Sequence, residues 1–212
     1  KLAADSVKRV AQELGGKSPN IILDDADLKT AVIAGVHACN TNAGQNCQSP
    51  TRMLVPRAQR EAAFDAAREA IAAIRLGDPM DPASTMGPLV SRAQYDKVQA
   101  LIQSAIDEGA TLVAGGPGRP EHVAQGFYVR PTVFGDVTPQ MRIAREEVFG
   151  PVLSVMSYNS DDEAVAIAND TPFGLAGFVQ SRDPARARAV ANRIRAGRVY
   201  INGAVFDRSL PF

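Results

Sequence analysis

A cysteine and a glutamate, each beside a glycine-marked turn, are the residues of this sequence best suited to chemistry. Cys47 lies in a turn rich in Gly, Asn and Gln, between an apolar run typical of a helix and one typical of a strand. A thiol at such a junction is displayed at the surface, where reactive groups are commonly found. Glu13 precedes Leu14 and the Gly15-Gly16 pair. A thiol nucleophile and a carboxylate base predict covalent catalysis followed by general-base hydrolysis.

The two cysteines of the chain have different surroundings. Cys39 follows His37 in an apolar helical stretch, which predicts a buried, inert side chain. Cys47 lies among polar residues that include Asn46 and Gln48, and such a loop supplies backbone N–H groups that favour the reactive thiolate. One alternative is a cysteine hydrolase or transferase in which His37 activates Cys47. The helical position of His37 instead favours packing in the core.

Length and composition limit the classes of protein to consider. The 212 residues suit one large domain or two small ones. Because 23 basic residues balance 23 acidic ones, we expect no broad binding to nucleic acid or to an anionic membrane. No apolar run approaches the roughly 20 residues that span a bilayer. Two cysteines are too few for a disulfide framework, which predicts a cytoplasmic setting, and two histidines predict no zinc site.

Strand-like and helix-like segments alternate along the chain, which predicts one α/β domain with a largely parallel sheet. The predicted strands are 7–14, 19–23, 51–55, 111–114, 127–134, 152–158, 198–201 and one beginning at 178–179. The predicted helices are 28–39, 60–74, one between a cap at Ser91 and a stop at Gly109, 161–169, and one from Asp183-Pro184 to about Ala196.

Five segments, in order, resemble the aldehyde dehydrogenase superfamily, and the resemblance runs nearly end to end. The segments are 13–19 (Glu-Leu-Gly-Gly-Lys-Ser-Pro), 44–52 around Cys47, 147–151 (Glu-Val-Phe-Gly-Pro), 169–175 and 199–203. The resemblance implies an open, mostly parallel sheet with helices on both faces. It also implies that residues 1–212 are the thiol-bearing catalytic domain, with the dinucleotide-binding domain upstream and the C-terminal oligomerisation strand both outside this chain.

The mechanism implied by the resemblance oxidises an aldehyde to a carboxylic acid with NAD or NADP. Cys47 would attack the aldehyde carbon to form a thiohemiacetal and then a thioester, and Glu13 would activate the water that hydrolyses it. Glu147 would bind the ribose of the nicotinamide cofactor, and Phe149 would pack close to its ring. Leu14 completes the expected contacts near the nicotinamide.

Further expectations concern contacts and assembly. By the same resemblance, Gln94 and Lys97 touch the cofactor, whereas Asn46, Gln48 and Asn202 contact the substrate. The polarity of Asn46 and Gln48 favours a polar or small aldehyde. We expect the complete protein to be a homo-oligomer and the 212-residue chain alone to have little or no activity. The other alternative is a non-catalytic fragment that serves as an interaction module.

Overall fold

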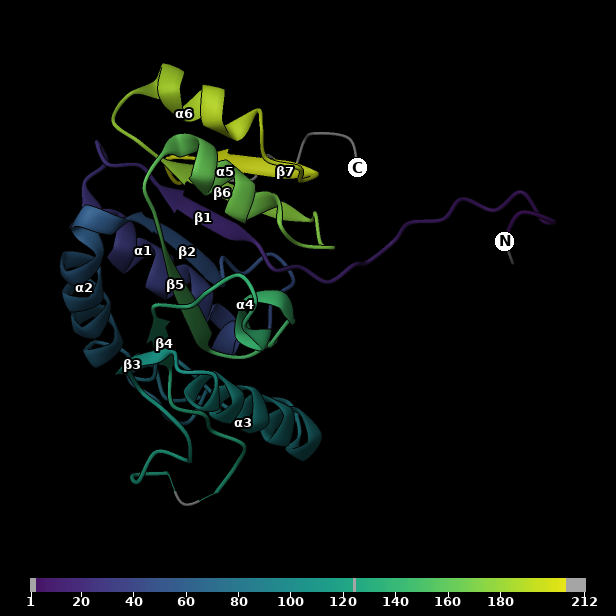
Figure 1. Cartoon of the computed structure of the whole chain (residues 1–212). Coiled ribbons are helices and arrows are strands. Elements are labelled where there is room, and N and C mark those ends of the chain that lie inside the picture. Colours follow the sequence, from purple (N-terminus) through teal and green to yellow (C-terminus); the bar gives the residue numbers. More distant parts are fainter. Residues whose placement is uncertain (1–2, 124, 205–212) are drawn as a thin grey trace.

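A seven-stranded sheet with helices on both faces organises the part of the chain that the structure describes, residues 3–123 and 125–204 (Figure 1). The structure is a computed structural model. The strand order is β3-β4-β5-β2-β1-β6-β7. All neighbouring strands are parallel except β3 and β4. The strands are β1 (Pro19–Ile22), β2 (Arg52–Pro56), β3 (Thr111–Ala114), β4 (Thr132–Gly135), β5 (Val152–Tyr158), β6 (Ala176–Gln180) and β7 (Arg198–Ile201).

The helices divide into two layers, each with its own apolar cluster. The helices are α1 (Leu28–Asn40), α2 (Arg60–Ala72), α3 (Arg92–Asp107), α4 (Arg142–Arg145), α5 (Asp161–Asn169) and α6 (Pro184–Ala191). On one face, α1 and α2 pack with Ile22 and Met53. On the other face, α3, α5 and α6 pack with Ile21 and Leu54. Because successive strand residues point to opposite faces, each central strand contributes to both clusters. The α/β class, the mostly parallel sheet and the two helical layers confirm the prediction.

Side-chain caps begin helices α1, α3 and α6 where the sequence predicts a start, and Ser160 caps α5 in the same way. Asp27 accepts a hydrogen bond from the Thr30 amide at 3.2 Å, and Ser91 accepts one from the Gln94 amide at 3.2 Å. Asp183 accepts from the Ala185 amide at 2.8 Å, with proline in the first turn of α6. Each cap satisfies an amide that has no partner within its helix.

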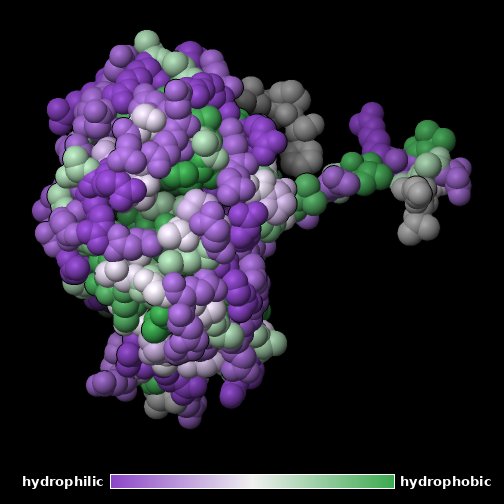
Figure 2. Space-filling model, in the orientation of Figure 1, coloured by the Kyte–Doolittle hydropathy of each residue, from purple (hydrophilic) through white to green (hydrophobic). Residues whose placement is uncertain are grey.

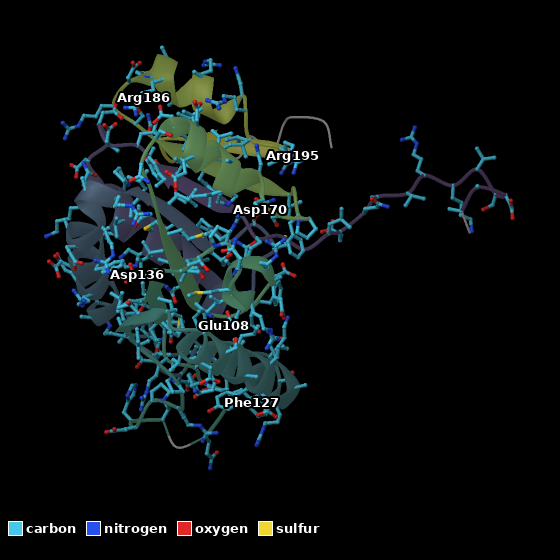
Figure 3. All side chains as sticks on the ribbon, viewed as in Figure 1. Glu108, Phe127, Asp136, Asp170, Arg186 and Arg195 are labelled. Atoms are coloured by element: carbon cyan, nitrogen blue, oxygen red, sulfur yellow. The ribbon has the colours of Figure 1, made fainter. Side chains whose placement is uncertain are left out.

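An ion-pair cluster attaches α6 to neighbouring elements. Arg186, labelled in Figure 3, projects from α6 and donates to the Asp161 carboxylate at 2.9 and 2.7 Å and to Asp24 at 2.5 Å. These carboxylates raise the pKa of Arg186 above its usual value. Asp25, beside the same guanidinium, also accepts from the Ser181 hydroxyl at 2.7 Å. The cluster therefore connects the carboxyl ends of β1 and β6 to the start of α5.

Three predicted elements differ most from the structure, and the first of them is a strand that is absent from the described part of the chain. Residues 3–14 form an arm that leaves the sheet instead of a strand over 7–14 (Figures 1 and 2). Val7 is 90% exposed and Leu14 is 57% exposed. A β-strand requires a hydrogen-bonded neighbour, and β1 is paired with β2 and β6 instead.

The other two elements, a strand and a helix, are shorter than predicted. The strand expected over 127–134 begins only at Thr132, because the preceding residues contact a loop: the Phe127 carbonyl accepts from the Leu89 amide at 3.0 Å. Helix α6 ends at Ala191 instead of about Ala196, since the next residues form turns such as Ile194 N–H to Ala191 O at 3.1 Å. None of the described helices is long and apolar enough to cross a membrane.

Candidate active site

The three chemistry-bearing segments meet because each leads into one of three adjacent parallel strands. Glu13 and its turn precede β1, the Cys47 loop precedes β2, and the Glu147 segment precedes β5. Strand β2 pairs with both β1 and β5, and all three run in the same direction. Their amino ends therefore lie at one edge of the sheet. The topology thus brings together residues that are far apart in the sequence.

Backbone contact between these segments is close enough to require glycine. A side chain at Gly16 would overlap the carbonyl oxygen of Cys47. A side chain at Gly44 would overlap the carbonyl of Gly150, and Gly44 also has a φ of +72°, which residues with a Cβ rarely adopt. The glutamate turn, the cysteine loop and the segment after Glu147 therefore form one packed unit.

The cysteine loop begins with a left-handed turn. Asn42 and Ala43 have φ values of 54° and 55°, a conformation that costs a residue such as alanine on the order of 1–2 kcal/mol. Gln45 holds this turn, because its amide and its side-chain Nε2 each donate to the Asn42 carbonyl at 3.1 Å. The Asn46 side chain then accepts from the Gln48 amide at 2.9 Å. Local hydrogen bonds thus define the backbone on both sides of Cys47.

Cys47 and Glu13 border two pockets. One pocket, of about 500 Å³, is lined by Glu13, Leu14, Gly15, Asn42, Gln45, Asn46, Cys47, Glu147 and Phe149. The other, of about 200 Å³, is lined by Gln12, Glu13, Leu14, Cys47, Gln48, Leu175, Gly197 and Arg198. The Cys47 thiol is free and half-buried, and Glu13 is exposed. The predicted nucleophile and base therefore lie between a pocket with the predicted nicotinamide contacts and a pocket that contains Gln48.

The Glu147 segment is held by hydrogen bonds from two directions. The Gly16 amide donates to Glu147 Oε1 at 2.9 Å, and Lys97 Nζ donates to the Glu147 carbonyl at 2.8 Å. Gln94 Nε2 donates to the carbonyls of Val148 and Phe149 at 2.9 and 2.8 Å. The structure thus places Gln94 and Lys97 as supports of this segment, and their contact with a cofactor stays a prediction.

Asn202, like Gln94 and Lys97, lines neither pocket of Cys47, and it lies in a different part of the structure. Its side-chain oxygen accepts from the Ser181 amide at 2.9 Å. It lines a separate pocket of about 310 Å³ together with the start of α1. This pocket lies at the carboxyl ends of β1, β6 and β7, the edge of the sheet opposite to the cysteine loop.

Cys39 and His37 differ from each other in burial. Cys39 is completely buried and its thiol contacts the Val152 carbonyl at 3.6 Å, as the apolar helix face predicts. Burial raises the pKa of Cys39 to about 12, so this thiol is inert. The prediction that His37 packs in the core was wrong, because His37 is exposed. It follows Val36 by one residue in α1 and therefore lies on a different side of the helix from the buried face of Val36 and Cys39. His37 lines neither pocket of Cys47, which removes the basis for a Cys47–His37 pair.

Two buried cations beside the glutamate turn were missed by sequence reasoning. Lys17 is only 1% exposed, and desolvation lowers its pKa to about 7. Arg52, also 1% exposed, donates to the carbonyls of Lys17, Ile167 and Ala168 at 2.9, 2.9 and 2.8 Å. Burial lowers the Arg52 pKa to about 10. The carbonyls at the end of α5 favour this positive charge. One available signal was their place at the start of apolar strands: Arg52 is the first residue of β2, and Lys17 lies two residues before β1.

Comparison with known proteins identifies the family of this chain. The model of the aldehyde dehydrogenase family matches residues 1–212. The chain belongs to the aldehyde dehydrogenase family. A curated relative, 3-succinoylsemialdehyde-pyridine dehydrogenase of a Pseudomonas species, is 50% identical over 99% of this chain and 44% of its own length. The chain thus spans less than half the length of this curated relative.

Solved structures of aldehyde dehydrogenases show the same fold. A Cys-to-Ala mutant of aldehyde dehydrogenase C from Pseudomonas syringae, in complex with NAD+ and octanal, is 52% identical with a TM-score of 0.96. That match covers 99% of this chain and 43% of the other. The Mycobacterium tuberculosis aldehyde dehydrogenase in complex with NAD+ is 44% identical with a TM-score of 0.94, over 99% of this chain and 43% of that one.

Proposed function

We propose that residues 1–212 form the thiol-bearing catalytic domain of an NAD(P)+-dependent aldehyde dehydrogenase, and that the activity belongs to a longer polypeptide. The observation that carries this proposal is the position of Cys47 and Glu13 between two pockets, with Glu147 and Phe149 on one side. A nucleophile, a base and a cofactor-side carboxylate are the groups that thioester chemistry requires. The proposed substrate is a small-molecule aldehyde.

The residues around the larger pocket fit the nicotinamide end of NAD(P)+. Glu147 uses one carboxylate oxygen for the Gly16 amide, and a carboxylate has further acceptor sites for ribose hydroxyls. Phe149 is half-buried in the same pocket, where its ring offers an apolar surface. When bound, NAD(P)+ supplies the acceptor of the hydride that leaves the substrate. Two of the structural relatives were determined with NAD+.

The chain itself provides the covalent steps of the proposed reaction. The Cys47 thiolate attacks the aldehyde carbon and forms a thiohemiacetal. No hydrogen bond within the described residues uses the Cys47 amide, which leaves it able to donate to the developing oxyanion. Loss of hydride gives a thioester on Cys47. Glu13 then takes a proton from water, the resulting hydroxide adds to the thioester carbon, and the carboxylic acid and free thiolate are released.

Mass spectrometry of Glu13 and Cys47 variants tests this proposal in the complete enzyme. With aldehyde and NAD+, Glu13→Gln is expected to accumulate an acyl adduct on the peptide that contains Cys47, because hydrolysis loses its base. Cys47→Ala is expected to abolish both adduct and turnover. Cys39→Ala, which alters the buried cysteine, is the matched control and should turn over. Turnover by Cys47→Ala would exclude the proposal.

The 212-residue chain alone separates the proposed function from that of an inert interaction module. We expect it to show little or no aldehyde oxidation with NAD(P)+. We also expect iodoacetamide to label Cys47 much faster than Cys39, since one thiol is half-buried and the other is fully buried. Equal labelling of the two thiols in the folded chain would favour the inert module. Robust turnover by this chain would contradict our assignment of the activity to a longer polypeptide.

The setting and assembly of the complete enzyme are further parts of the proposal. We infer a cytoplasmic setting, because two free cysteines fit a reducing compartment. We also propose, from the family resemblance, that the complete enzyme is a homo-oligomer. The sequence carries equal numbers of acidic and basic residues, which supports the absence of nucleic-acid and membrane partners. Size-exclusion chromatography with light scattering tests the oligomer, and a monomeric complete enzyme would contradict it.

A further inference from the structure

Gln45 connects the cysteine loop to a helix that lies outside the predicted chemistry. Its side-chain Oε1 accepts from the Val90 amide at 2.9 Å, while its Nε2 donates to Asn42 in the loop. Val90 immediately precedes Ser91, the N-cap of α3. Gln45 therefore joins the backbone two residues before Cys47 to the start of α3.

The first turns of α3 hold the cofactor-side segment. Gln94 and Lys97 both lie on α3, and they donate to the carbonyls of residues 147–149 at 2.8–2.9 Å. The Ser91 cap fixes the same turn through the Gln94 amide. The contacts made by Val90, Gln94 and Lys97 therefore all fall at the start of one capped helix. Helix α3 thus contacts the cysteine loop through Gln45 and the Glu147 segment through its own side chains.

The Glu147 carboxylate extends the connection to the third segment. Its Oε1 accepts from the Gly16 amide at 2.9 Å, and Gly16 in turn packs on the Cys47 carbonyl. The links form a closed circuit from Gln45 through α3 and Glu147 to Gly16 and back to the cysteine loop. In this circuit, Gln45 is the side chain that joins the loop to α3.

We propose that Gln45 is a positioning residue that sets Cys47 relative to the cofactor-side segment through α3. The role of Gln45 in catalysis rests on the proposed function. The coupling of the cysteine loop to the Glu147 segment through α3 does not. If Gln45 loses its bond to Val90, the cysteine loop loses its side-chain connection to the start of α3, while the bonds between Asn42 and the Gln45 backbone still hold the left-handed turn. If Lys97 is replaced, the Glu147 segment loses a hydrogen bond to α3, so the same set of contacts is broken at a second point.

The rate of Cys47 alkylation by iodoacetamide in the folded 212-residue chain tests this coupling. Gln45→Met removes both side-chain hydrogen bonds; loss of the bond to Val90 by itself corresponds to about a fivefold faster alkylation, and we expect at least that factor. Gln45→Glu keeps the acceptor for the Val90 amide and should stay close to the wild-type rate. Gln103→Met is the matched control, because Gln103 lies on α3 and bonds only to Asp107 on the same helix.

A double-mutant cycle with Lys97→Met distinguishes coupling from a merely local effect. Lys97→Met alone should accelerate alkylation, although Lys97 does not contact the cysteine loop. In the Gln45→Met background it should add little, because the circuit is already open. Additive effects, unchanged rates, or a Gln45→Glu variant as fast as Gln45→Met would each overturn the proposal. The assay uses neither aldehyde nor cofactor, so its result is independent of the Cys47→Ala activity test of the proposed function.

Discussion

Lys17 predicts an unusual dependence of stability on pH. Its side chain is almost completely buried, and its pKa falls from 10.5 to about 7 in the folded chain because burial disfavours the ammonium ion. The titratable groups that interact with it are the neutral thiol Cys39 and the charged side chains Arg52, Glu147 and Glu146. Below pH 7 Lys17 is protonated in both the folded and the unfolded chain. Above pH 7 the folded chain releases this proton, while the unfolded chain retains it up to about pH 10.5.

The sign and the size of the effect follow from this difference in bound protons. Stability rises with pH wherever the unfolded state binds more protons, by about 1.4 kcal/mol per pH unit for one group. Between pH 7 and 9, Lys17 should therefore increase the free energy of unfolding by about 2 kcal/mol, because the folded chain is still half protonated at pH 7. Above pH 9 the gain is offset by Cys39. The unfolded chain loses the Cys39 proton near pH 9.0, whereas the folded chain retains it up to about pH 12, which favours the unfolded state.

Urea unfolding, followed by circular dichroism at several pH values from 6.5 to 9, measures this slope. Wild-type chain should gain stability with pH, and Lys17→Met should show a nearly flat profile over the same range. Lys29→Met is the control, since Lys29 is an exposed lysine paired with Glu69 at 2.7 Å and should keep the wild-type slope. A slope retained in Lys17→Met would refute the assignment of the effect to this buried amine.

Three further substitutions have expected outcomes from packing and capping. Gly16→Ala should destabilise the chain by about 1–3 kcal/mol in urea unfolding and change the Cys47 alkylation rate, because its methyl group overlaps the Cys47 carbonyl; a wild-type rate would contradict this contact. Arg52→Met should cost about 3 kcal/mol or more, because three carbonyls lose their donor; unchanged thermal unfolding would contradict it. Ser160→Ala should cost about 1 kcal/mol by loss of the α5 cap at the Glu163 amide, and an unchanged urea midpoint would argue against that cap.

Local sequence patterns predicted most of the elements and the identity of the candidate site. Helix starts at Ser91 and Asp183 follow from cap chemistry that depends only on neighbouring residues. The alternation of strands and helices predicted the parallel sheet, since such strands need crossover connections. Polar neighbours distinguished Cys47 from the buried Cys39 before any contact was known. The helix starts are predictable because each cap depends on interactions within a few residues.

Which residues meet and which are buried depends on the tertiary structure. The arm over 3–14 has strand-like composition, but a strand exists only where a neighbour supplies hydrogen bonds, and β1 is already paired on both sides. Lysine and arginine are mostly exposed in proteins, yet Lys17 and Arg52 are buried between the ends of β1, β2 and α5. Gln45 accepts a hydrogen bond from Val90, which is 45 residues further along the chain and lies just before α3. Residue types and local patterns thus define which chemistry is available. The parallel arrangement of three strands sets the geometry of the site, because contact between distant segments depends on the whole fold.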